Sequence, residues 1–182
     1  TGFDLALEAE AVLADARKAL CEFFGGSQPN RLVFSLNVTD ALNLLIGSVL
    51  APGDHAITTC LEHNSVLRPM YRQQQHGVEV DWVPFDGRGY VDPDDIARRI
   101  RPNTKLVIMN HGSNVIGTLQ PVAEVGRRCR ERGVLFAVDA AQTAGLVDID
   151  VAAMNIDVVC FTGHKSLFGP TGTGGMYVGE HV

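Results

Sequence analysis

One lysine stands in the stretch FTGHKSLFGPTGTGG, residues 161–175, beside a histidine, two hydroxyl residues and a run of glycines. Lys165 could be a surface charge, a phosphate clamp or a nucleophile for a carbonyl group. It follows the apolar run VVCF, which should be a buried strand, so we expect its amine to be partly desolvated. Desolvation favours the neutral, nucleophilic form of a lysine. The glycine spacing of a Walker phosphate loop is missing, which argues against that kind of clamp.

A carboxylate ends another apolar run, VLFAVDAAQ. Burial of an ionised acidic side chain such as Asp139 costs free energy unless a cation pairs with it. Asp139 could cap a helix or pair with an arginine. It could also hold the protonated ring nitrogen of a cofactor.

Three further loops carry polar residues that could do chemistry. NVTDALN opens a helix after a strand, where Thr39 can cap the helix while the free N–H groups of its first turn bind an anion. His63, in EHNS, is either an ordinary residue at a helix entry or a functional group. Asn114, in GSNVIGT, either makes a turn or contributes to a site. Each signal is weak when taken alone.

Alternating elements must position these loops. Short apolar runs predict strands at Arg31–Leu36, His55–Thr59, Glu79–Val83, Lys105–Met109, Val134–Val138, Val158–Phe161 and Gly175–Val178. Apolar spacing predicts helices at Leu5–Phe24, Thr39–Leu50, Ser65–His76, Asp92–Ile100 and Val122–Arg132. Strands that alternate with helices indicate an α/β fold with a parallel sheet covered on both faces. Ligands bind such sheets beyond the carboxyl ends of the strands, so five polar loops could converge on one site.

Composition restricts the remaining possibilities. The 182 residues show no repeat or linker, and we interpret residues 1–182 as one domain. The net charge of −6 without a continuous basic stripe argues against nucleic acid as a partner. No apolar run reaches the roughly 20 residues of a membrane span, and the start does not resemble a signal peptide. Four widely spaced cysteines predict no metal site and a reducing, cytoplasmic location.

Five of these pieces, in order, resemble the pyridoxal 5'-phosphate (PLP) site of the class V aminotransferase and cysteine desulfurase family of fold-type I enzymes. The pieces are TDALN, EHNS, SNVIGT, DAAQ and TGHKSLFGPTGTGGMYV, between Asn37 and Val178. The resemblance implies a seven-stranded, mainly parallel sheet with helices on both faces and an antiparallel last strand, Gly175–Val178. It identifies residues 1–182 as the large, PLP-binding domain. Family members are typically homodimers with active sites at the subunit interface.

The resemblance also implies a role for each matching residue. Lys165 would form a Schiff base with the cofactor aldehyde and move protons at the substrate α-carbon. Asp139 would pair with the pyridinium nitrogen. His63 would stack on the ring, Gln142 would bond its phenolic oxygen, and Asn114 would lie near that oxygen and the substrate. The phosphate would be held by Thr39, the amides around Val38, Thr162 and His164.

The implied activity is that of a cysteine desulfurase, which converts L-cysteine to L-alanine and passes sulfur to an enzyme cysteine. Its partners would be an amino-acid substrate and a sulfur-acceptor protein. The shared cofactor loops leave an aminotransferase or a selenocysteine lyase open, as well as a truncated domain that is silent on its own. A nucleotide-binding domain is disfavoured because neither a Walker loop nor GxGxxG is present.

The sequence departs from the family pattern in three places. Val38 stands where many desulfurases have a second threonine. The segment before the first long helix and the small C-terminal domain are not in this sequence. In the family, that C-terminal domain supplies the arginine for the substrate carboxylate and the sulfur-accepting cysteine. Of the four cysteines we expect Cys60, close to His63, to be the one worth testing for reactivity, and Cys160 to be a core residue.

Overall fold

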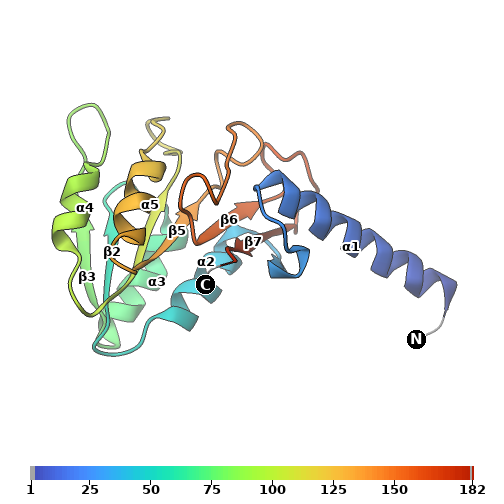
Figure 1. Ribbon diagram of the computed structural model, residues 1–182, viewed down its shortest axis with the longest axis horizontal. Helices are drawn as coiled ribbons and strands as arrows, with labels where there is room; N and C mark the ends of the chain where they lie inside the picture. Colours follow the sequence, from blue (N-terminus) through green and yellow to red (C-terminus); the bar gives the residue numbers. More distant parts are fainter. Residues whose placement is uncertain (1–2, 181) are drawn as a thin grey trace.

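A seven-stranded mixed sheet forms the centre of the protein (Figure 1). The computed structural model describes residues 3–180 and residue 182. The strands are β1 (Leu32–Ser35), β2 (His55–Thr59), β3 (Glu79–Val83), β4 (Thr104–Asn110), β5 (Leu135–Asp139), β6 (Val158–Thr162) and β7 (Gly174–Val178). Their order across the sheet is β1-β7-β6-β5-β4-β2-β3, and β7 runs antiparallel to both of its neighbours. The predicted strand set and the antiparallel last strand are confirmed.

Helices cover both faces of the sheet, as predicted. They are α1 (Asp4–Phe23), α2 (Val38–Val49), α3 (Asn64–Gln75), α4 (Pro93–Arg99) and α5 (Val122–Arg130), with a short 3₁₀ turn at Pro29–Arg31. Side chains of β4 alternate between two cores: Leu106 and Ile108 pack with α2 and α3, whereas Val107 and Met109 pack with α4 and α5. This two-sided burial is the reason that the run LVIM is continuously apolar.

Helix α1 differs from the others because it projects away from the sheet (Figure 1). Its apolar stripe predicted a helix correctly, but Leu5 and Val12 are 78% and 68% exposed. Cys21 is the buried residue of this helix among the described residues. Near its carboxyl end, Arg17 donates to the backbone oxygen of Leu32, and its guanidinium lies over the Phe34 ring. The apolar residues in the first half of α1 are therefore not covered by another element in the described part of the chain, whereas Leu20 and Cys21 near its end pack against the core.

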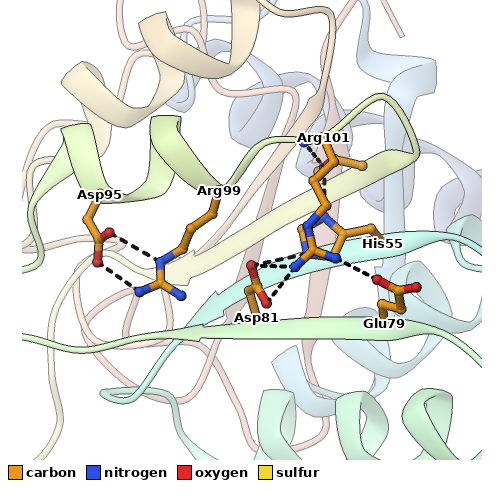
Figure 2. Close-up of polar contacts among 7 residues, drawn as sticks. His55, Glu79, Asp81, Asp95, Arg99 and Arg101 are labelled. Atoms are coloured by element: carbon orange, nitrogen blue, oxygen red, sulfur yellow. Dashed lines mark hydrogen bonds and ion pairs between the residues drawn. The ribbon is translucent and has the colours of Figure 1, made fainter.

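A polar network closes the amino-terminal ends of β2 and β3 (Figure 2). Arg101 donates to both carboxylate oxygens of Asp81 at 3.0 Å and also to Glu79. Buried His55 makes a 2.7 Å hydrogen bond through Nδ1 to the Thr104 hydroxyl, and its Nε2 lies 3.5 Å from Asp81. Burial, and then the charge of Arg101, lower the pKa of His55. This network joins edge strand β3 to the rest of the sheet.

Candidate active site

A cavity of about 310 Å³ opens at the carboxyl-terminal ends of the strands. Its walls come from the segments that follow β1, β2, β4, β5 and β6, which are the five loops predicted to converge. All nine predicted site residues line it: Val38, Thr39, His63, Asn114, Asp139, Gln142, Thr162, His164 and Lys165. Five lining residues were not among the predicted ones: Asn37, Ser65, Asn110, Gly112 and Ala141.

Asp139 is the acidic residue among those that line the cavity. It ends β5 and is 4% exposed. Its Oδ1 accepts a 2.9 Å hydrogen bond from the amide of Ala141, so a local turn satisfies one oxygen. Burial raises the pKa of this carboxyl, and the Ala141 amide, Lys165, His63 and Ser65 oppose that rise. No arginine forms an ion pair with Asp139 within residues 3–180, so the cation it needs is not an arginine of that part of the chain.

His63 begins helix α3 and also lines the cavity, so both sequence interpretations apply to it. Its Nδ1 accepts from the backbone amide of Ser65 at 3.2 Å and lies 2.9 Å from the Ser65 hydroxyl. Because Nδ1 accepts from an amide, a neutral His63 carries its proton on Nε2. Buried Ser65 also helps to lower the pKa of Asp139, so it acts on both groups. Ser65 was not predicted as a site residue, and its place two residues after His63 in EHNS is the signal that could have identified it.

The first turn of α2 lies at the cavity, but its cap differs from the prediction. Asn37 caps the helix: its Oδ1 accepts from the amide of Asp40 at 3.0 Å, and Thr39 belongs to the helix itself. Asn37 has the extended backbone of an N-cap residue and a side chain of the preferred type. The prediction that Thr39 caps the helix is therefore wrong, although Thr39 still lines the cavity. The amides of Val38 and Thr39 have no partner within the helix because they belong to its first turn.

Two side chains from the end of β6 line the cavity together with that helix start. The Thr162 hydroxyl and His164 Nδ1 are 3.0 Å apart, and α2 packs against β6. Hydroxyl, imidazole and helix-terminal amide groups together form a donor set suited to a phosphate group.

Lys165 lies in a tight loop after β6. The amide of Gly163 donates to the oxygen of Thr173, and the amide of Gly169 donates to the oxygen of Gly163. Lys165 itself is exposed at the cavity, so the expected partial desolvation is not provided by the described residues. The physical reason is that Lys165 follows the end of β6 at Thr162 and belongs to the loop that leads to β7, not to the buried strand itself. Gly145 approaches the loop so closely that an added Cβ would lie 2.3 Å from the oxygen of Ser166.

The cysteines do not contribute to the cavity. Cys60 is exposed directly after β2, but it is not among the lining residues. The other three cysteines are buried, and burial raises the pKa of the Cys129 thiol to about 12. Cys160 is fully buried in β6, which confirms the prediction that it is a core residue. Residues 3–180 and 182 contain no cluster of three metal-binding side chains, and no helix among them could cross a membrane.

Comparison with known proteins agrees with this geometry. The chain belongs to the aminotransferase class-V family, whose model matches residues 1–182. It is 37% identical over 181 residues to a probable cysteine desulfurase of Methanothermobacter thermautotrophicus. That alignment covers 99% of this chain and 45% of the other protein. Among solved structures, the apo cysteine desulfurase of Thermococcus onnurineus NA1 is 33% identical, with a TM-score of 0.92 over 100% of this chain and 46% of that one.

A second solved structure, described as SspA in complex with cysteine, is 31% identical. Its TM-score is 0.92, and the match covers 98% of this chain and 52% of that one. The chain therefore spans about half the length of the proteins that it matches. The family and its fold are shown, and the seven-stranded sheet is that of PLP-dependent cysteine desulfurase structures.

Proposed function

We propose that residues 1–182 are the large, PLP-binding domain of a cysteine desulfurase. The observation that carries this proposal is the convergence of a buried carboxylate, a lysine amine and a helix amino terminus on one cavity. PLP presents a ring nitrogen, an aldehyde and a phosphate, and each of these would meet a complementary group in the cavity. The named desulfurases among the relatives support the choice of this reaction within the family.

The residues present fit this cofactor. Asp139 is a buried carboxylate whose pKa is raised by burial, and a protonated ring nitrogen would supply a cation that stabilises its ionised form. The α2 amino terminus with Thr39, Thr162 and His164 would hold the phosphate. Gln142 and Asn114 lie in the same cavity and would bond the phenolic oxygen and the substrate side. When bound, the cofactor withdraws electrons from the substrate α-carbon.

The chain's own residues would then have distinct tasks. Lys165 would bind the cofactor covalently and, once substrate has displaced it, carry a proton to or from the substrate α-carbon. Asp139 would keep the ring nitrogen protonated. His63, held by Ser65 with its proton on Nε2, would lie against the ring. These three groups are the ones we propose to be catalytic.

The complete reaction would convert L-cysteine and an acceptor thiol into L-alanine and a persulfide on that acceptor. The C–S bond breaks, a proton is added at carbon, and the sulfur bonds to the acceptor sulfur, with no external oxidant. The structure of a relative in complex with cysteine supports this substrate class. No cysteine or arginine lines the described cavity. We therefore propose that the acceptor thiol and the group that binds the substrate carboxylate lie outside residues 1–182, and that sulfur passes on to an acceptor protein.

We also propose that the protein is a homodimer. The exposed apolar residues of α1, among them Leu5, Leu7, Val12 and Leu13, support an interface on this helix. A cytoplasmic location is proposed as well, and the four free cysteines support a reducing compartment.

Titration with PLP tests the cofactor assignment. We expect a visible absorption band from the lysine-bound cofactor in the wild type, and its complete loss in Lys165→Ala. The matched control is Lys105→Ala, because Lys105 is an exposed lysine on β4 outside the cavity. A band that survives in Lys165→Ala, or that Lys105→Ala abolishes, would contradict the assignment.

A further inference from the structure

Glu62 is a buried carboxyl next to the cavity that does not line it. It lies between the end of β2 and His63 and is 7% exposed. Its Oε1 accepts from the Thr59 hydroxyl at 2.6 Å and from the backbone amide of Asn110 at 3.0 Å. Its Oε2 is buried and has no hydrogen-bond partner among the described residues. The side-chain amide of Asn110 in turn donates to the oxygen of Leu61 at 2.8 Å.

Glu62 lies where strands β2 and β4 stop pairing with each other. Strands β2 and β4 pair from His55 to Ile57 on β2, and β2 then continues along β3 as far as Thr59. Asn110, at the end of β4, lies past the last residue of β4 that pairs with β2, so β2 offers it no ladder hydrogen bond. The Glu62 carboxyl supplies the acceptor that a strand would otherwise supply, so it joins the two strands where they separate.

Both ends of this link belong to the cavity. His63 follows Glu62 directly in the chain and caps α3. Asn110 lines the cavity and is the register partner of Asp139 on β5. A change in the Glu62 carboxyl would therefore move the histidine and the end of the strand beside Asp139 together.

The surroundings of Glu62 favour its neutral form. An ionised carboxylate with one buried, unpaired oxygen is costly. Burial raises the pKa of Glu62 to about 8; the Thr59 hydroxyl and the Asn110 amide oppose this rise, and the charge of Asp139 adds to it. Lys165 and His63 lower the pKa of Asp139, whereas neither of them shifts the pKa of Glu62. Buried His111, which follows Asn110, has a pKa lowered by burial and so adds no positive charge at neutral pH.

We propose that Glu62 is a positioning residue that acts in its protonated form, joining the His63 loop to the end of β4 without placing a second negative charge beside Asp139. This role rests on the proposed function, because it concerns the placement of groups that would hold PLP. Ionisation of Glu62 would force the loop to open so that water can reach Oε2. His63 would then leave its position against the cofactor.

The first test uses unfolding without cofactor, so it does not depend on PLP. The pKa of Glu62 in the folded protein is above its unfolded value of about 4.3. Its stabilising contribution is therefore full at low pH and is lost as the pH rises to about 8. Relative to Glu62→Gln, the folded-to-unfolded ratio of the wild type should fall about tenfold per pH unit between pH 5.5 and 7.5.

Urea denaturation of both proteins at pH 5.5, 6.5 and 7.5 measures this ratio. Gln keeps the oxygen that accepts from Thr59 and Asn110, so Glu62→Gln should fold. The control is Glu124→Gln, an exposed glutamate in the first turn of α5, whose curve should stay parallel to that of the wild type. Parallel curves for the wild type and Glu62→Gln would overturn the proposal, because Glu62 would then be ionised in the folded protein.

The second test is PLP affinity, read from the visible band between pH 7 and 9. Above pH 8 the wild-type affinity should fall relative to Glu62→Gln, approaching tenfold per pH unit. At pH 7 Glu62→Gln should bind within about threefold of the wild type, whereas Glu62→Ala should bind at least tenfold more weakly. Equal affinity of Glu62→Ala and the wild type would overturn the positioning role. If the wild type shows no band at all, the proposed function fails, while the unfolding result still decides the state of Glu62.

Discussion

The two ends of the sheet treat their buried ionisable groups in opposite ways. At the amino-terminal end, His55 is fully buried, its Nδ1 is hydrogen-bonded to the Thr104 hydroxyl, and its Nε2 lies 3.5 Å from Asp81, whose charge Arg101 balances (Figure 2). At the carboxyl-terminal end, Asp139 is almost as buried; it accepts a hydrogen bond from the Ala141 amide, and Lys165 and His63 lower its pKa without forming an ion pair with it in the described part of the chain. At the first end an arginine of the same chain pairs with Asp81, whereas at the second end no arginine of the described residues pairs with Asp139.

The network at the amino-terminal end concerns the stability of the sheet, and the groups at the carboxyl-terminal end concern binding. Arg101 is 42% exposed, so its ion pairs are screened, and such pairs contribute roughly 0–1 kcal/mol each. Their value lies in fixing edge strand β3. The cavity end holds polar groups that would be costly without a ligand, which is the arrangement expected of a binding site.

Paired substitutions of aspartate test the contrast most strongly. Asp139→Asn should keep the fold but lower turnover of L-cysteine by the full-length protein roughly 10²-fold or more, since a neutral amide cannot hold the ring nitrogen protonated. It should not lower the free energy of unfolding without cofactor, because it removes a buried charge. Asp81→Asn should show the reverse: a loss of about 1 kcal/mol in unfolding free energy with unchanged turnover. Unchanged turnover in Asp139→Asn would refute the role of Asp139.

Two glycines with nearly the same positive φ sharpen the comparison at a smaller scale. Gly145 has φ +92° and would place a Cβ 2.3 Å from the Ser166 oxygen, whereas Gly53, before β2, has φ +91° and open space around it. Gly145→Ala should weaken PLP binding about tenfold or more because it displaces the Lys165 loop. Gly53→Ala should cost only the strain of the conformation, about 1 kcal/mol of unfolding free energy. PLP titration and urea denaturation measure both effects, and equal PLP affinity of the two variants would show that the loop tolerates displacement.

The apolar pattern of the chain predicted the strands, most clearly in the centre of the sheet, where a strand such as β4 is buried on both faces. The antiparallel direction of β7 came from the family resemblance and not from this pattern. The apolar pattern was also sufficient to bring together Lys165, Asp139 and His63, since polar residues that follow such runs must meet at one edge of the sheet. The exposure of the α1 stripe could not be predicted, because an apolar helix face does not show whether its cover lies in the same chain.

The helix cap and the contacts between distant residues could not be predicted from the sequence. Asn37 and Thr39 are both acceptable caps, and only the backbone conformation distinguishes them. The link from Glu62 to Asn110 and the network around Arg101 join residues about 20 to 50 positions apart. No periodicity in the sequence reports such pairs. The exposed position of Lys165 depends on a loop whose path is set by glycines.

Covalent trapping of the cofactor tests the central claim most directly. The chain contains three lysines, Lys18, Lys105 and Lys165, so reduction of the PLP-treated protein with borohydride followed by peptide mass mapping can identify the reacting amine without ambiguity. The account predicts stoichiometric labelling of Lys165 with little on the other two. Equal labelling of all three lysines, or labelling of Lys18 or Lys105 in place of Lys165, would contradict it.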